Sequence, residues 1–335
     1  MKTLDKCPST LQPGFNGYSP IAVRLLFDGT IVSPMIDIDL ESEQGQKTAQ
    51  ENQSNLSISG AQEKFSAVVD HGVLRLAKSS EQGTHILKPA PDNHRLIGRK
   101  QLPANEHLTM QIAAQVYGVR TASNALCFGR NGQLIYVTRR FDVKPDLTKW
   151  QMEDFASVLG VTEQGSGENF KYQGNYAQIA DAIRRIVPAW MIETERFFRL
   201  VLFNYIYANE DAHLKNFSII ITDGECRLAP AYDLINTHVH LDSGRDLALD
   251  GGLADDIEPS DVYQRTGHPC RLDFERFARR IGLPEKRFIK LLNLFATIPP
   301  ETYRLIDASF LDARTKRTYK RIIQERTARF NRLSD

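Results

Sequence analysis

Apolar and polar residues alternate in short runs through the first part of the chain, a pattern typical of β-strands. The runs at 21–27 and 31–34 flank the turn sequence DGT and predict a short hairpin. A second hairpin is predicted around the sequence DHG at 70–72. HILKPA at 85–90 predicts a further strand that its prolines end.

A helical period occurs in this part between Asn105 and Tyr117, where apolar residues recur at three- to four-residue spacing and Gly118 ends the pattern. Two more strands are predicted at 122–128 and 132–143, joined by a glycine-containing turn. We therefore expect a mixed sheet that carries one helix.

The pattern becomes mainly helical after residue 142, with one β-like island at 217–234. A small β-rich part followed by a larger helical part predicts an α+β fold with two lobes, residues 1–142 and 143–335. The expected helices lie at 151–160, 175–187, 193–209, 273–281, 284–296 and 312–332.

Composition narrows the class of protein. The 335 residues are 41% hydrophobic and 25% charged with a formal net charge of +1, which excludes collagen-like and wholly disordered chains and a uniformly basic nucleic-acid binder. Four cysteines without CxxC spacing argue against a disulfide framework or a zinc cluster. The sequence contains neither an apolar signal-peptide run nor an 18-residue apolar stretch, so we expect a cytoplasmic protein with no membrane partner.

The densest polar chemistry lies at 209–216 (NEDAHLKN), directly after the apolar sequence FFRLVLFNYIYA. Asp211 and Asn216 are five residues apart, and Asp233 follows an apolar strand. Protein kinases use this order: the first aspartate meets the acceptor hydroxyl, and the asparagine and second aspartate hold Mg²⁺ on the phosphates. Lys215 can neutralise charge on the transferred phosphoryl group.

A matching nucleotide site is predicted upstream. Lys88 ends a strand, where an ammonium can pair with the α- and β-phosphates, and Glu106 on the next helix can position it. The backbone amides of SISGAQ at 57–62 can hold phosphate oxygens. The order of these features along the chain predicts an ATP-dependent phosphotransferase.

Several strings in the sequence, including SISGAQEKFS, HILKPA, RRFD, NEDAHLKNFSI and APAYDL, resemble the HipA family of bacterial serine/threonine kinase toxins. The resemblance runs from about residue 55 to about residue 235. It implies a two-lobed protein-kinase-like fold with a small N-lobe and a larger, mostly helical C-lobe. It also implies ATP and Mg²⁺ as cofactors and a serine/threonine protein kinase activity.

The resemblance assigns roles to individual residues. Asp211 and Lys215 are implied to be catalytic, and Asn216 and Asp233 to be the magnesium ligands. Residues 139–141 would form the hinge beside adenine, with Asp142 near the ribose. The implied nucleotide-binding residues are Lys88, Glu106, Ser59, Gly60, Ala61, Gln62, Arg139, Phe141, Asp142, His213 and Tyr232.

The chain also departs from the family pattern. The phosphate loop begins near residue 57, without the roughly one hundred residues that precede it in full-length members. It is therefore similar to the short HipT form of three-gene toxin–antitoxin systems. In those systems a small HipS protein resembles the missing part and HipB binds DNA. The loop carries two serines, Ser57 and Ser59, and the resemblance implies that their autophosphorylation lowers activity.

The resemblance further implies an aminoacyl-tRNA synthetase substrate, the tryptophanyl enzyme for the short form, whose phosphorylation halts translation and promotes persistence. The implied partners are a HipS-like antitoxin that completes the N-lobe and a HipB-like protein that alone contacts DNA. Two alternatives stay open: a catalytically weak nucleotide-binding scaffold in a repressor complex, and a small-molecule kinase.

The basic segment 313–333 predicts an amphipathic helix. Its aromatic and aliphatic residues would pack, and its Lys and Arg face would be solvated or would contact an acidic partner surface.

Overall fold

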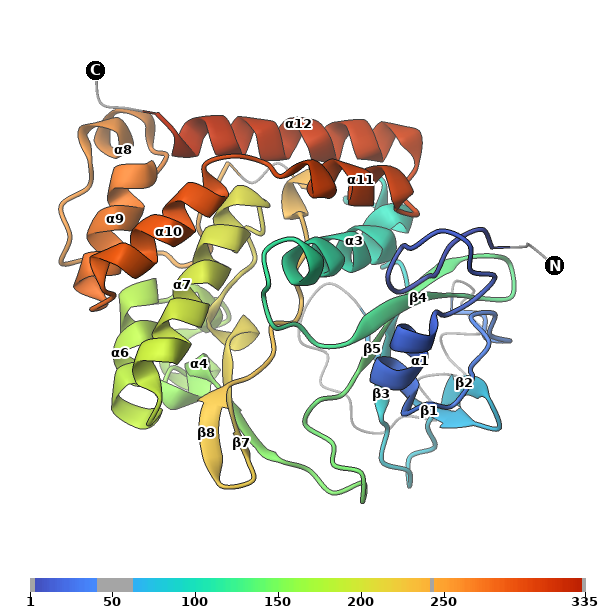
Figure 1. Cartoon of the computed structure of the whole chain (residues 1–335). Helices are drawn as coiled ribbons and strands as arrows, with labels where there is room; N and C mark the ends of the chain where they lie inside the picture. The colour runs from blue at the N-terminus through green and yellow to red at the C-terminus, as the bar shows by residue number, and fades with distance from the viewer. Residues whose placement is uncertain (1–3, 41–62, 242–243, 333–335) are drawn as a thin grey trace. The chain divides into compact units, whose positions relative to one another are not determined.

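The computed structural model describes residues 4–40, 63–241 and 244–332 (Figure 1). The chain divides into two compact units, each built from several segments. Sequence analysis placed one boundary between residues 142 and 143, whereas the units change between Lys149 and Trp150 and also exchange segments that return from later in the chain. The first unit comprises Met1–Ile112, Thr121–Lys149 and Tyr303–Lys316, and the second comprises Ala113–Arg120, Trp150–Thr302 and Arg317–Asp335.

The first unit contains a five-stranded sheet in the order β2-β1-β3-β5-β4. Each neighbouring pair is antiparallel, so the sheet expected as mixed has a single type of pairing. Its apolar face is buried with Leu26, Phe27 and Val32. The strands are β1 (Phe65–Asp70), β2 (Val73–Leu76), β3 (His85–Lys88), β4 (Asn124–Phe128) and β5 (Leu134–Arg139).

The hairpin predicted at 70–72 is confirmed, with Asp70 paired to Val73. Both turn residues, His71 and Gly72, have positive φ, as tight hairpin turns require. A Cβ at Gly72 would lie 2.9 Å from the carbonyl oxygen of Ile31, so the turn needs glycine for close approach as well as for its backbone conformation.

The strand predicted at 21–27 is wrong, because this segment forms helix α1 (Pro20–Phe27). Ser19 caps the helix, its side chain accepting from the backbone N–H of Ala22, and Pro20 occupies the first turn. Leu26 and Phe27 are buried in the core of the sheet. The cap and the burial of this helical face together favour a helix.

Helix α3 (Leu102–Gln115) is the helix predicted between Asn105 and Tyr117, and it begins three residues earlier. A 3₁₀ turn, η1 (Arg99–Gln101), precedes it. Residues 102–113 of the helix are all buried, although the segment contains asparagine, glutamate, histidine and threonine. Such burial requires partners for the polar groups, and it brings their chemistry inside the protein.

Buried histidines make the fold sensitive to acid. Burial lowers the pKa of His85, His107 and His213 to about 4, below the value of about 6.5 in an unfolded chain. Between these pH values the unfolded chain binds more protons than the folded chain. As the pH decreases from 6.5 to 4, the free energy of unfolding therefore falls by up to about 1.4 kcal/mol per pH unit for each histidine. We expect His107→Gln to reduce the slope of that free energy between pH 6.5 and 4 in urea titrations.

The matched control is His94→Gln, because the His94 side chain is 80% exposed. An unchanged slope for His107→Gln, or an equal change for both variants, would contradict the assignment of the acid sensitivity to buried imidazole.

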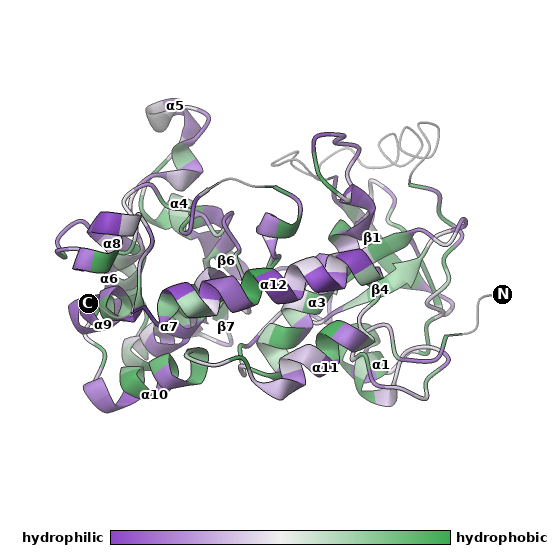
Figure 2. Cartoon of the chain, turned by 90° about the horizontal axis from the view of Figure 1, so that it is seen from above, coloured by the Kyte–Doolittle hydropathy of each residue, from purple (hydrophilic) through white to green (hydrophobic). Residues whose placement is uncertain are grey.

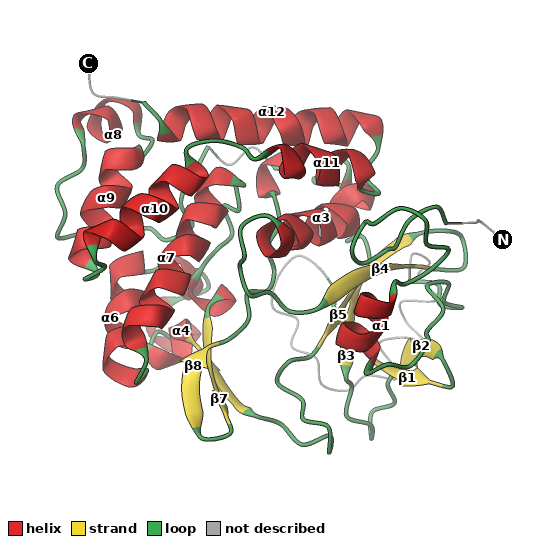
Figure 3. Ribbon diagram, in the orientation of Figure 1, coloured by secondary structure: helices red, strands yellow, loops and turns green. Residues whose placement is uncertain are grey.

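The second unit is mostly helical (Figure 3). Helices α3, α11 and α12 contribute residues to both units. The described helices after residue 150 are α4 (Phe155–Val158), α5 (Glu163–Ser166), α6 (Tyr176–Ile186), α7 (Trp190–Ile206), α8 (Asp261–Thr266), α9 (Arg271–Arg280), α10 (Glu285–Phe295), α11 (Pro300–Ala308) and α12 (Ala313–Phe330).

A three-stranded antiparallel sheet, in the order β6-β7-β8, lies in the same unit. The predicted β-like island forms β7 (Ser218–Thr222) and β8 (Glu225–Leu228). The helix predicted at 151–160 is wrong in its first half, which is strand β6 (Gln151–Asp154). Asp154 pairs with Ser218 and then caps α4 through its carboxylate, so one residue ends the strand and begins the helix.

The predicted packing of the C-terminal helix is confirmed. Tyr319, Ile322, Ile323 and Phe330 of α12 are buried, while hydrophilic positions recur along the helix (Figure 2). Among the described helices, none is long and apolar enough to cross a membrane.

Candidate active site

Lys88 ends β3, the central strand of the five-stranded sheet. Its ammonium donates to Glu106 Oε1 of α3 at 2.6 Å and lies 5.3 Å from the centroid of the Tyr136 ring. The two charged side chains are only 4% and 3% exposed. Removing either partner would take this ion pair from a buried charge, so the pair fixes the ammonium at the end of the strand.

The segment 209–216 follows α7, whose last seven residues, 200–206, are all buried. Ala208 has φ of +50°, and the chain turns there into the polar segment. A short 3₁₀ helix, η3 (Leu214–Asn216), ends it, and the His213 backbone N–H donates to Asn216 Oδ1 at 3.2 Å. The buried helix therefore gives the polar loop a rigid base.

Asp211 projects its carboxylate toward solvent, with 52% of the side chain exposed. The Tyr172 hydroxyl donates to Asp211 Oδ1 at 2.6 Å. Burial, together with the Asp211 carboxylate, raises the pKa of Tyr172 above its usual value. Tyr172 therefore stays protonated near neutral pH and orients one oxygen of Asp211, while the carboxylate stays accessible.

Removing the Tyr172 hydroxyl should weaken turnover more than nucleotide binding. Tyr172→Phe loses a hydrogen bond to a charged group, worth about 1.5 kcal/mol or more, and frees the orientation of Asp211. We expect kcat for phosphate transfer to fall about tenfold, with little change in KM for ATP. Tyr263→Phe, which also removes one hydroxyl from the second unit, is the control; a higher kcat for Tyr172→Phe would instead indicate competition with the acceptor hydroxyl.

His213 lies beside this pair. Its Nε2 is 3.9 Å from Asp211 Oδ1, and its ring packs edge-on against Tyr172 with centroids 5.2 Å apart. Burial lowers the pKa of His213 to about 4, so the imidazole is neutral at pH 7. At neutral pH it offers packing and a polar nitrogen beside Asp211.

Tyr232 connects the polar loop to the segment that carries Asp233. Its hydroxyl donates to the Lys215 carbonyl oxygen at 2.8 Å and lies 2.6 Å from Ser218 Oγ. The Lys215 ammonium lies 5.8 Å from the centroid of the Phe170 ring. The resemblance implies a nucleotide-binding role for Tyr232. In the structure its hydroxyl connects the polar loop to the segment that carries Asp233.

Asp233 has φ of +55°, which is uncommon for a residue with a side chain. Asn209 Nδ2 donates to the Asp233 carbonyl oxygen at 3.4 Å and to Asn204 Oδ1 at 3.1 Å. Strained backbone of this kind persists only where neighbouring contacts hold it, and it occurs often at functional sites.

The donor set fits Mg²⁺. Asn216 and Asp233 offer amide and carboxylate oxygens, the hard ligands that Mg²⁺ prefers. Within the described ranges no group of three or more His, Cys, Asp or Glu side chains is positioned to hold a metal. A nucleotide would therefore have to supply further oxygens, as it does in phosphotransferases.

The predicted hinge side chains have partners within the first unit. Arg139 pairs with Asp28, and Arg140 binds Asp142 through two nitrogens, one at 3.0 Å. Any contact from Arg139 to a nucleotide would compete with Asp28. The phosphate-loop residues Ser57, Ser59, Gly60, Ala61 and Gln62 lie outside the described residues.

The sequence analysis missed a buried ion-pair network beneath the polar loop. Arg326 of α12 pairs with Glu210, which precedes Asp211, and with Asp246. The three side chains are 3%, 4% and 3% exposed. His268 Nδ1 and Arg329 also contact Asp246, at 2.8 and 3.1 Å. The network holds the polar loop, the segment after Asp233 and α12 together.

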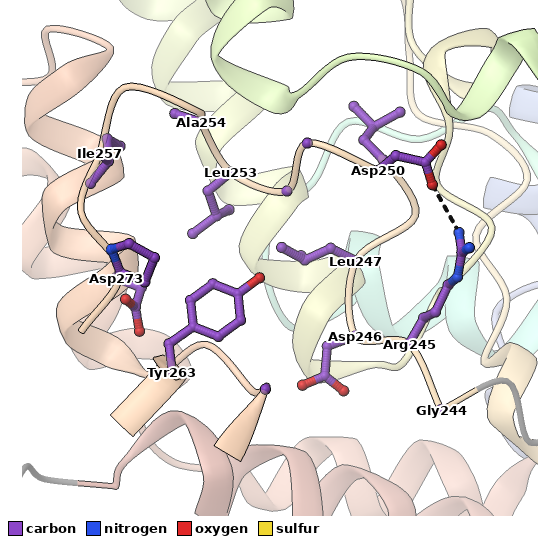
Figure 4. A pocket seen from close by; sticks show the side chains of 15 residues that line it. Gly244, Arg245, Asp246, Leu247, Asp250, Leu253, Ala254, Ile257, Tyr263 and Asp273 are labelled. Atoms are coloured by element: carbon purple, nitrogen blue, oxygen red, sulfur yellow. Dashed lines mark hydrogen bonds and ion pairs between the residues drawn. The ribbon is translucent and has the colours of Figure 1, made fainter. Parts of the chain in front are cut away.

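A cavity of about 490 Å³ lies along the segment after Asp233 (Figure 4). Leu247, Leu253 and Tyr263 line it, and Arg245 pairs with Asp250 at 3.1 Å. The Asp250 backbone N–H donates to the Tyr172 carbonyl oxygen at 2.8 Å. This segment therefore supports the tyrosine that orients Asp211.

A known family matches most of the chain. The HipA-like C-terminal domain matches residues 56–300, which is more than half of the chain. The match covers the Lys88–Glu106 pair, the polar loop and Asp233.

Among curated relatives, a putative kinase of Haemophilus influenzae is 25% identical over 236 residues, 68% of this chain and 66% of the relative. A putative kinase of Sinorhizobium fredii is 30% identical over 200 residues, 58% and 45% of the two chains. The serine/threonine-protein kinase toxin HipA of Shewanella oneidensis is 25% identical over 264 residues, 73% and 56%. The chain thus spans about half to two thirds of these relatives' length.

Solved structures show the same fold. HipA of Shewanella oneidensis, in a complex with HipB and operator DNA, gives a TM-score of 0.60 at 23% identity, covering 82% of this chain and 65% of that one. The Helicobacter pylori proinflammatory kinase CtkA gives 0.52 at 15% identity, covering 83% and 92%. The predicted kinase-like α+β fold is therefore confirmed.

Proposed function

Because the chain belongs to the HipA-like C-terminal domain family, we propose that it is an ATP- and Mg²⁺-dependent serine/threonine protein kinase that acts as a toxin. The observation that carries the proposal is the buried Lys88–Glu106 ion pair at 2.6 Å. Burying such a pair costs free energy, which a functional role would explain. Kinases bind phosphates with a strand lysine that a helix glutamate positions.

Asp211 would accept the proton of the acceptor serine or threonine hydroxyl as that oxygen bonds to the γ-phosphorus, while the bond from the γ-phosphorus to the β–γ bridging oxygen breaks and ADP leaves. Tyr172 holds the other side of that carboxylate, so the accepting oxygen keeps its direction. ATP with Mg²⁺ supplies the phosphoryl group and the positive charge that stabilises its transfer. Asn216 and Asp233 would hold the metal, because they offer hard oxygens on two braced segments.

Lys88 would bind the α- and β-phosphates, and Lys215 would neutralise charge on the transferred group. His213 would line the phosphate site, and in the free protein burial keeps its imidazole neutral, with a pKa of about 4. The hinge at 139–141 would meet adenine, and Asp142 would lie near the ribose; both contacts would use the backbone, since the Arg140 and Asp142 side chains bind each other.

Regulation and partners belong to the same proposal. Phosphorylation of Ser57 or Ser59 adds about −1.5 to −2 charges, which would repel nucleotide phosphates. A HipS-like protein would bind the chain as antitoxin, and a HipB-like protein would bring the toxin to DNA, as the HipB complex of the Shewanella HipA suggests. The substrate would be an aminoacyl-tRNA synthetase, with the tryptophanyl enzyme as first candidate.

Transfer from γ-labelled ATP tests the proposal, with the full chain incubated alone and with tryptophanyl-tRNA synthetase. We expect label on both proteins with Mg²⁺ and none with a chelator, and peptide mass spectrometry should place the chain's own label on Ser57 or Ser59. ATP binding without label on either protein or on small alcohol acceptors would favour the scaffold alternative. Label on small acceptors alone would favour a small-molecule kinase.

A further inference from the structure

The second unit contains a larger cavity away from Asp211 and Asp233. It measures about 1040 Å³ and lies between α7 and α10, which run side by side (Figure 1). Residues 118–120 and the end of β8 close it. We call this cavity the α7–α10 groove.

The groove is strongly basic, although the chain as a whole carries a formal net charge of only +1. Glu195 is the carboxylate among the lining residues, and two arginines already share it: Arg287 at 3.0 Å and Arg199 at 3.9 Å. The lining cations are Arg120, Arg196, Arg199, Lys286, Arg287 and Lys290.

This positive charge is only partly compensated: Arg196 pairs with Glu193 at 2.5 Å, and Arg199 and Arg287 share Glu195. Among the described residues neither Lys286 nor Lys290 has an ion-pair partner, and both are exposed. Burial, together with the like charges of Arg196 and Arg227, lowers the pKa of Arg120 despite the opposing effect of Glu193. The groove therefore favours an anionic occupant.

The rest of the lining is aliphatic. Ile192 and Leu294 are 51% and 36% exposed, and the buried Leu200, Leu228 and Leu291 also line the groove. Among the residues that the structure describes, no aromatic side chain lines it, so these residues offer no platform on which bases of a nucleic acid would stack. An occupant with both carboxylates and aliphatic side chains complements such a surface.

We propose that the α7–α10 groove binds an acidic segment of a partner protein, whose aliphatic side chains contact Ile192, Leu291 and Leu294 and whose carboxylates meet the surrounding cations. On α10, Lys286, Lys290 and Leu294 follow at four-residue intervals and so share one face of the helix. That face can bind a helical segment whose acidic and aliphatic residues also recur at four-residue intervals. Binding at this groove does not depend on phosphate transfer.

The test uses a fluorescein-labelled peptide of about 16 residues, made of Glu and Leu in amphipathic helical order. We expect saturable binding by fluorescence anisotropy at physiological salt. Lys286→Glu/Lys290→Glu should weaken it at least tenfold, because two attractive contacts become repulsive. Leu294→Ser should weaken it several-fold through lost apolar contact.

The control is Arg185→Glu/Lys320→Glu, which makes the same change of charge outside the groove lining and should leave the affinity unchanged. Circular dichroism checks that each variant is folded. An equal loss of peptide affinity in both double variants would show that only the net charge of the protein matters, and it would overturn the proposal. Tighter binding of a 16-nucleotide oligouridine than of the peptide would also overturn it, in favour of a nucleic-acid surface.

Discussion

Asp211→Asn should reduce phosphate transfer by about 10³-fold while leaving nucleotide binding in place. The amide keeps the size of the carboxylate and can still contact Tyr172, but it cannot accept the proton of the acceptor hydroxyl. Proton transfer by a positioned side chain typically contributes 10² to 10⁴ in rate. Single-turnover transfer from labelled ATP, with ATP affinity from isothermal titration, separates the two effects.

Asp255→Asn is the matched control. Asp255 is an exposed aspartate of the same unit with no ion-pair partner among the described residues. The Asp255→Asn variant should transfer phosphate at the wild-type rate. Transfer by Asp211→Asn within tenfold of wild type would exclude Asp211 as the proton acceptor, and a parallel loss of ATP affinity would point to a folding defect.

Arg326→Met should destabilise the second unit by about 3–5 kcal/mol. The substitution leaves Glu210 buried without its guanidinium and removes the Arg326 partner of Asp246, and breaking a buried pair in this way costs more than the pair contributes. Arg321→Met on the same helix removes a pair with Glu325 whose side chains are 63% and 45% exposed, so it should cost less than 1 kcal/mol.

Urea unfolding followed by tryptophan fluorescence measures both variants, and phosphate transfer reports on the polar loop. Combining Arg326→Met with Glu210→Gln should recover part of the lost free energy, because a neutral amide is cheaper to bury than a lone carboxylate. Similar stability for Arg326→Met and Arg321→Met would contradict the network's role.

Most elements of the fold could be predicted from local pattern. Strand β3 and helix α3 follow directly from periodicity, and the order of Lys88 and Glu106 along the chain led to the contact that the structure contains. Helix α1 was read as a strand because its apolar run is short, although Ser19 and Pro20 carry the signal of a helix start. Strand β6 was missed because its residues are polar and its pairing partner lies more than sixty residues later.

The ion-pair network was beyond sequence reasoning for a different reason. Glu210 and Arg326 are 116 residues apart, and Arg326 stands in a helix rich in Lys and Arg that are mostly solvated. Charge composition cannot tell which cation of such a helix turns inward. Only its register against the core, set by Tyr319, Ile322 and Ile323, selects Arg326.

Because Glu210 and Arg326 lie far apart in the sequence, they are also synthesised at different times. A ribosome adds about 5–20 residues per second, so Arg326 is made roughly 6–23 s after Glu210. Until then, the loop that carries Asp211 lacks the cation that neutralises its buried neighbour. A chain still being translated therefore lacks this ion pair beside the candidate catalytic loop until synthesis has passed α12.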